Sequence, residues 1–169
     1  WKPDAVQKII GIEDAPIIVH VAGNLVPDES FEGEEAVSWT VRDEANGTAA
    51  VEGGLASQGQ QPLQVTGPAE GWAMAIARCS EVTPNARGQA YRIAAKIRLG
   101  TEISKARVGI EWLTGSGANA RSRGFSFSGF ATPGGFTEVS TVVKAPGGAD
   151  HLRAVAAVTG DGNARFDDV

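Results

Sequence analysis

The sequence contains little cysteine, fewer basic than acidic residues and no long apolar run. Its single cysteine, Cys79 among 169 residues, excludes an internal disulfide and argues against a thiolate metal cluster. The apolar stretches are far shorter than the roughly 18 residues that a membrane-spanning helix needs. The 15 Lys and Arg residues are outnumbered by 20 Asp and Glu, which gives a net charge of −5. We therefore expect neither nucleic acid nor a membrane as a partner.

Apolar residues and turn-forming residues are both plentiful. The chain is 42% hydrophobic, which is enough for an ordinary globular core, and its length suggests one domain. It also contains 22 Gly and 8 Pro, more turn-forming residues than are expected in a helical protein. This composition favours many short strands separated by turns.

Apolar and polar residues alternate with a period of two, as expected for strands with one buried face. In residues 89–99, Tyr91 begins an apolar series, while Arg92, Lys96 and Arg98 lie on the other face. In residues 106–113, Trp112 lies on the apolar face and Glu111 opposite. Further runs with this period lie at residues 36–41, 63–65, 72–79, 125–130, 136–144, 152–158 and 164–169.

The number and spacing of these runs predict an all-β fold. About nine to eleven short strands without intervening helices are typical of a two-sheet antiparallel β-sandwich. Only residues 3–10 fit a helix, and residues 16–22 fit a strand. We expect residues 1–22 to be an N-terminal extension or the end of a preceding domain. Since the chain opens on Trp1 without an initiator Met, we also expect it to be part of a longer protein.

Motifs of enzyme active sites are not convincing in this sequence. Residues 115–120 fit a G-x-G-x-x-A dinucleotide pattern, but strand-like residues follow where the pattern requires a helix. His20 and His151 lie on separate expected strands without partners at metal-ligand spacing. The sequence contains no nucleophile-elbow, zinc-protease or phosphate-loop motif. We therefore expect the domain not to be an enzyme.

Both ends of residues 24–169 resemble one family. Residues 24–33 read Asn-Leu-Val-Pro-Asp-Glu-Ser-Phe-Glu-Gly and precede Trp39; residues 88–91 read Gly-Gln-Ala-Tyr, and residues 166–169 read Phe-Asp-Asp-Val. This series resembles carbohydrate-binding modules of the family 4/9 type, which have a galactose-binding-like jelly roll. Asp28 departs from the pattern, because the family more often has Asn there. The resemblance implies a jelly-roll domain over residues 23–169.

The resemblance also implies a structural calcium ion between the N-terminal loop and the last strand. Carried over to this sequence, Glu32 and Asp167 are its expected side-chain ligands. Asp167 shares a strand face with Val169 and should point inward, where a carboxylate needs a cation or hydrogen-bond donors. The alternative is a metal-free Asp167 hydrogen-bonded to backbone N–H groups of the N-terminal loop.

The expected sugar site consists of aromatic rings that stack on sugar C–H surfaces, flanked by polar groups. Tyr91, Trp112 and Trp39 are better explained as core. The remaining candidates are Trp72, Phe125, Phe127 and Phe130. Arg92 and Glu111, with Lys96, Arg98, Arg107 and Arg153, would add a polar, net-basic surface suited to an anionic or heavily hydroxylated glycan, if they share one sheet. The alternative for these charged residues is an ordinary solvated sheet face.

These observations predict a non-catalytic module that binds a polysaccharide or oligosaccharide. It would target further domains of a larger bacterial protein, secreted or on the cell surface, to a glycan. The alternative is a structural or assembly domain of the same fold that binds no sugar.

Overall fold

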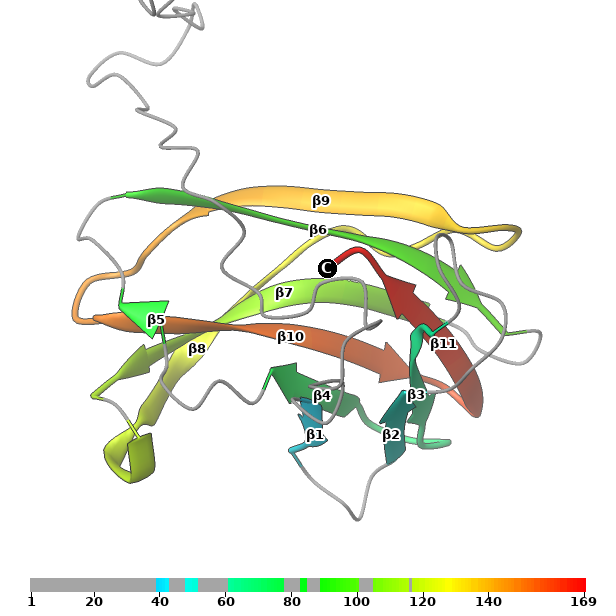
Figure 1. Ribbon diagram of the computed structural model, residues 1–169, viewed down its shortest axis with the longest axis horizontal. Coiled ribbons are helices and arrows are strands. Elements are labelled where there is room, and N and C mark those ends of the chain that lie inside the picture. Colours follow the sequence, from blue (N-terminus) through cyan, green and yellow to red (C-terminus); the bar gives the residue numbers. More distant parts are fainter. Residues whose placement is uncertain are drawn as a thin grey trace, which may run out of the picture.

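A computed structural model describes residues 39–42, 48–51, 61–77, 83–84, 89–100, 105–115 and 117–169 of the chain. These residues form eleven β-strands and one short 3-10 turn, η3 (Gly117–Asn119), in two facing sheets (Figure 1). Within the same ranges, no helix has the length and apolar character required to span a bilayer.

The first sheet, sheet A, has six strands, and all its pairings are antiparallel. Its strands follow the order β1 (Trp39–Val41), β4 (Ala73–Ala77), β10 (His151–Thr159), β7 (Lys105–Thr114) and β8 (Arg121–Phe127), and β5 (Thr83–Pro84) also pairs with β10. The long central pair β10–β7 is in register from His151 opposite Leu113 to Thr159 opposite Lys105.

The second sheet, sheet B, has five antiparallel strands. Its order is β2 (Thr48–Val51), β3 (Leu63–Gly67), β11 (Gly162–Asp167), β6 (Ala90–Leu99) and β9 (Thr137–Lys144). In Figure 1, β6 and β9 run along the top of the view, β7 and β10 cross its middle, and β4 and β1 lie below them. The predicted two-sheet antiparallel sandwich is therefore confirmed.

The core lies between the sheets and is formed by alternate residues of each strand. On β7 the inward residues include Val108 and Trp112, and on β6 they include Ile93 and Ile97. Phe166 of β11 is fully buried among them. Because successive strand side chains point to opposite faces, one inward series necessarily leaves the other facing away from the core.

Several predicted strands begin or end at different residues in the structure. β8 starts at Arg121 and ends at Phe127, a few residues earlier than the aromatic pattern indicated. Residues 83–84, which lie outside the strand runs predicted above, pair with β10, and β2 was not predicted either. Both segments are too short for alternation to be visible. The helix and strand expected in residues 1–22, and the boundary between residues 22 and 23, lie outside the described residues.

Candidate functional site

The outer face of sheet A brings together aromatic and charged side chains from three adjacent strands. On β7 the outward positions include Arg107, Gly109 and Glu111, since Val108 and Ile110 belong to the core. On β8, Phe127 is the register partner of Gly109, and Phe125 is the partner of Glu111. Arg153 of β10 lies opposite Glu111 on the other side. These residues form one continuous surface across β10, β7 and β8.

Four aromatic residues form two stacked pairs on this surface. The ring centroids of Phe125 and Phe127 are 5.7 Å apart, with an interplanar angle of 12°. Those of Trp72 and Phe130 are 6.1 Å apart at 14°. Arg107 lies between the pairs, its Cζ 3.9 Å from the Phe127 centroid and 4.3 Å from that of Trp72. All four aromatic residues predicted for sugar binding therefore meet in one place.

Local backbone features position the rings of this cluster. A Cβ on Gly109 would lie 2.4 Å from the Phe127 ring, so the glycine is what allows this ring to lie close to β7. Gly71 adopts φ +87 just before Trp72, and its carbonyl accepts a hydrogen bond from the Thr159 hydroxyl. Glycine is required at such a φ because other residues rarely adopt it.

Phe130 lies in an irregular segment that remains attached to β7. Ser128 N–H donates to the Val108 carbonyl at 2.8 Å, and Ala131 N–H donates to the Ala106 carbonyl at 2.9 Å. The intervening Phe130 is 43% exposed. Two backbone hydrogen bonds thus hold an exposed ring beside the strand.

Glu111 is fully buried although it lies on the outer face. Its Oε2 accepts a hydrogen bond from Arg153 Nε at 2.7 Å, and Oε1 is paired with Arg42 Nη1. Desolvation would raise the pKa of Glu111, but hydrogen bonds from Ser122, Arg153 and Arg42 outweigh it and hold the pKa below its usual value. The alternative of an ordinary solvated residue is therefore wrong for Glu111.

Arg42 is a cation of this surface that sequence analysis missed. It follows β1, where its backbone N–H donates to the Met74 carbonyl at 2.9 Å, and its Cζ lies 5.2 Å from the Phe125 centroid. Only the pairing of β1 with β4 brings it beside the rings. No local pattern in the sequence signals that contact.

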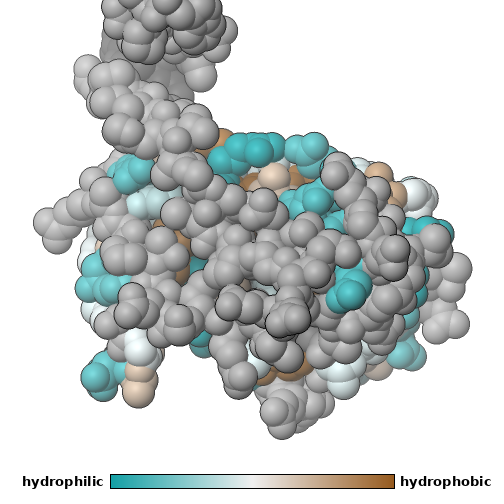
Figure 2. All heavy atoms as spheres, in the orientation of Figure 1, coloured by the Kyte–Doolittle hydropathy of each residue, from teal (hydrophilic) through white to brown (hydrophobic). Residues whose placement is uncertain are grey.

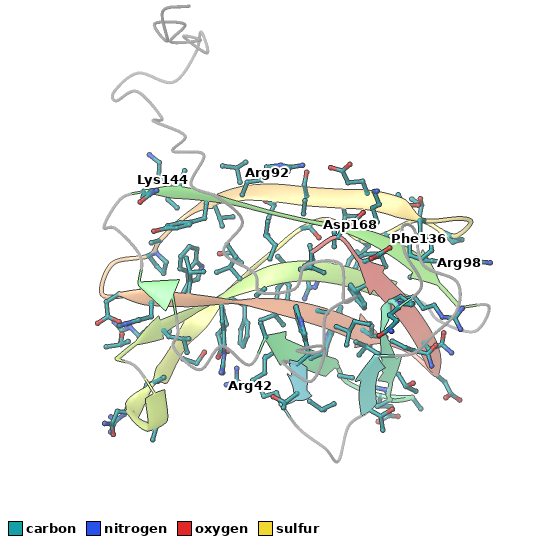
Figure 3. All side chains as sticks on the ribbon, viewed as in Figure 1. Arg42, Arg92, Arg98, Phe136, Lys144 and Asp168 are labelled. Carbon is teal, nitrogen blue, oxygen red and sulfur yellow. The ribbon has the colours of Figure 1, made fainter. Side chains whose placement is uncertain are left out.

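The structure does not bring Arg92 to this surface. Arg92 lies on β6 in sheet B, ion-paired with Glu138 of β9 at 2.9 Å. Lys96 and Arg98 belong to the same strand, so the six charged residues considered together divide between the sheets. In Figure 3, Arg42 and Arg92 project from opposite sides of the sandwich. Figure 2 shows hydrophilic side chains gathered over β6 and β9.

The aspartates at the end of the chain have different environments. Asp167 is fully buried at the end of β11, and its Oδ1 accepts the backbone N–H of Asp168 at 3.1 Å. Asp168 adopts φ 51 and forms an ion pair of 2.7 Å with Lys96. Glu32, the other expected calcium ligand, lies outside the described residues. Within the described ranges, no group of three or more His, Cys, Asp or Glu side chains could hold a metal ion.

No family model matches this chain, and no curated protein sequence does. Solved structures with the same fold include the CBM22-1 xylan-binding domain of Paenibacillus barcinonensis Xyn10C. It is 17% identical with TM-score 0.61, over 82% of this chain and 87% of that domain.

Two larger proteins also contain this fold. One comprises the CBM22-1 and GH10 modules of Clostridium thermocellum xylanase 10B, 15% identical with TM-score 0.56, over 77% of this chain and 25% of that one. The other is tailspike protein 4 of bacteriophage CBA120, 13% identical with TM-score 0.58, over 85% of this chain and 20% of that one. The chain thus spans a quarter or less of each. These likenesses support the two-sheet sandwich fold, and the resemblance to the family 4/9 type stays a prediction.

Proposed function

We propose that this domain is a non-catalytic polysaccharide-binding module that uses the outer face of sheet A. The observation that carries the proposal is the joint placement of Trp72, Phe125, Phe127 and Phe130 on one face. Flat aromatic rings can pack against the C–H face of a pyranose, and adjacent guanidinium groups can donate hydrogen bonds to the oxygens of the sugar. Arg42, Arg107 and Arg153 supply such donors here.

The glycans named for two proteins of similar structure support this function. The Paenibacillus domain is named as xylan-binding, and the Clostridium modules were solved in complex with xylohexaose. Xylan is accordingly the first glycan to test. A module of this kind would raise the effective concentration of attached domains at a polymer, which suits a secreted or cell-surface bacterial protein.

The alternative, a structural or assembly domain, is less well supported. It would be favoured by a sheet face that carries no aromatic platform. The outer face of sheet A carries two stacked aromatic pairs. Phe130 is exposed, and Trp72, Phe125 and Phe127 are half-buried. A cluster of partly exposed apolar side chains on one face is typical of a binding surface.

Trp72→Ala is expected to reduce polysaccharide affinity roughly tenfold to hundredfold, because an aromatic anchor contributes about 1.4–3 kcal/mol of binding free energy. Isothermal titration or affinity electrophoresis against neutral and acidic polysaccharides measures the change. Arg92→Gln is the matched control, since Arg92 lies on sheet B, and it should bind as the wild type does. If the wild type bound no polysaccharide of the panel, the proposed function would be refuted. If it hydrolysed or cleaved a glycan, its non-catalytic character would be refuted.

We also propose that calcium stabilises the domain through Asp167 and Glu32. In support, Asp167 presents a carboxylate with no exposure to solvent, and carboxylate oxygens are the ligands that Ca²⁺ prefers. Asp167 would anchor the ion from the last strand, so that binding favours the folded state. The alternative remains a metal-free Asp167 satisfied by hydrogen bonds.

Calcium at about a hundredfold above its Kd is expected to raise Tm by about 5–10 °C, because binding to the folded state alone adds about 2.7 kcal/mol. Differential scanning calorimetry of chelated and calcium-loaded protein measures the shift. Asp167→Asn should abolish it, whereas Asp161→Asn, at an exposed turn, should retain it. Equal Tm values with chelator and with calcium would favour the metal-free alternative.

A further inference from the structure

Arg107 is held among aromatic rings, and no carboxylate of the described residues pairs with it. Its Cζ lies 3.9 Å from the Phe127 centroid, 4.3 Å from that of Trp72 and 5.1 Å from that of Phe130. Its Nε is buried, and among the described residues it has no hydrogen-bond acceptor. Burial lowers the pKa of Arg107 from its ordinary value, yet a guanidinium remains protonated at neutral pH. The Arg107 guanidinium therefore keeps its positive charge although it is partly shielded from water.

Arg42, which lies beside Phe125, and Arg153, which lies beside Glu111, have different partners from those of Arg107. Arg42 and Arg153 both pair with Glu111, which is the only acidic residue at the outward positions described for sheet A. Lys105, which lies 5.2 Å from the Phe130 centroid, has no ion-pair partner in the described part of the chain. Lys105 and Arg107 are thus two cations that lie against Phe130 without an ion-pair partner among the described residues, and Arg107 also lies against Trp72.

This arrangement favours one class of ligand. A guanidinium flanked by rings is poorly hydrated, so less water must be removed when an anion binds it. Charge-assisted hydrogen bonds to a carboxylate are roughly twice as strong as those to a neutral hydroxyl. The adjoining rings can accept the C–H face of the same sugar. A pyranose with a carboxylate substituent satisfies both requirements together.

We propose that the Arg107 end of the sheet A face binds a uronic acid residue, and that the ligand is an acidic polysaccharide. This inference rests on the proposed function and adds the chemical class of the glycan. Arg107 pairs with the uronate carboxylate, Lys105 adds a second positive charge, and Trp72 and Phe130 contact the sugar ring. No covalent step is involved.

The experiment compares polygalacturonate and glucuronoxylan with their carboxyl-reduced counterparts, which keep the backbone and lose the charge. At low ionic strength, at least one acidic polymer should bind tenfold or more tightly than its reduced form. Arg107→Gln should abolish this preference, and Arg107→Lys should retain part of it. Arg98→Gln, the same charge change on sheet B, should leave the preference intact. Thermal unfolding of each variant establishes that it is folded.

The outcomes separate the two proposals. Equal binding of acidic and reduced polymers would overturn the uronate inference and leave polysaccharide binding standing. Equal loss in Arg107→Gln and Arg98→Gln would overturn it also, because net charge alone would then explain the preference. An absence of binding to these polymers and to neutral xylan would overturn both.

Discussion

Replacing Glu111 by glutamine is expected to lower the free energy of unfolding by about 2–4 kcal/mol. The buried carboxylate accepts hydrogen bonds from two arginines, and an amide cannot compensate their charges. The cost stays below that of a wholly buried pair because the Arg42 and Arg153 side chains are 36% and 23% exposed, so water can reach them. Urea denaturation at neutral pH measures the loss.

The matched control for this variant is the exposed pair of sheet B. The side chains of Arg92 and Glu138 are 56% and 58% exposed, and their N–O distance is 2.9 Å. Glu138→Gln should therefore cost less than about 1 kcal/mol. Similar losses in the two glutamine variants would contradict the argument that burial makes the Glu111 pairs important.

The effect of Glu111→Gln should depend on pH in a defined direction. Because the folded-state pKa of Glu111 is lowered, its ionised form contributes full stability above the unfolded-state pKa of about 4.3. That contribution is lost as the pH falls through the lower, folded-state pKa. The stability difference between wild type and variant should therefore narrow below about pH 4. A difference that widened in acid would show that the pKa is raised instead.

Alternation predicts the face of a residue but not its sheet. The period-two pattern correctly placed Trp112 inward and Glu111 outward, as well as Tyr91 with the apolar side. Yet the successive strands β6 and β7 belong to different sheets. Arg92 and Glu111, which follow equivalent patterns, consequently lie on opposite sides of the molecule. Sheet membership depends on strand pairing across the whole chain, which no local pattern encodes.

The chemical state of a residue also depends on register. From the sequence, Glu111 is expected to be solvated, because a carboxylate is buried only where other charges compensate it. Those charges come from Arg153, 42 residues away, and Arg42, 69 residues away. Similarly, the contact of Arg107 with Trp72 requires β4 and β7 to flank β10. The aromatic candidates could be identified because Phe125, Phe127 and Phe130 lie among glycines and serines, which do not suit a core strand.

Trp112→Ala is expected to cost about 3–5 kcal/mol of unfolding free energy, the range for removing a large aromatic ring from a core. Trp112 is 1% exposed, and its ring meets Tyr91 of sheet B edge-on at a centroid distance of 5.8 Å. Its Nε1–H donates to the Ser126 hydroxyl at 2.9 Å, a bond that joins β7 to β8. Losing the ring therefore weakens both the contact between sheets and the strand that carries Phe125 and Phe127. Chemical denaturation measures the loss.

Two comparisons distinguish this core role from ligand binding. Phe130→Ala, which removes an exposed ring, should cost about 1 kcal/mol or less in stability but should weaken glycan binding. Trp112→Phe keeps an aromatic ring in the core and should retain glycan affinity at temperatures well below its Tm, since Trp112 points between the sheets. If folded Trp112→Phe lost binding while Phe130→Ala kept it, the ligand would have to contact the interior, and the outer face of sheet A would not be the binding surface.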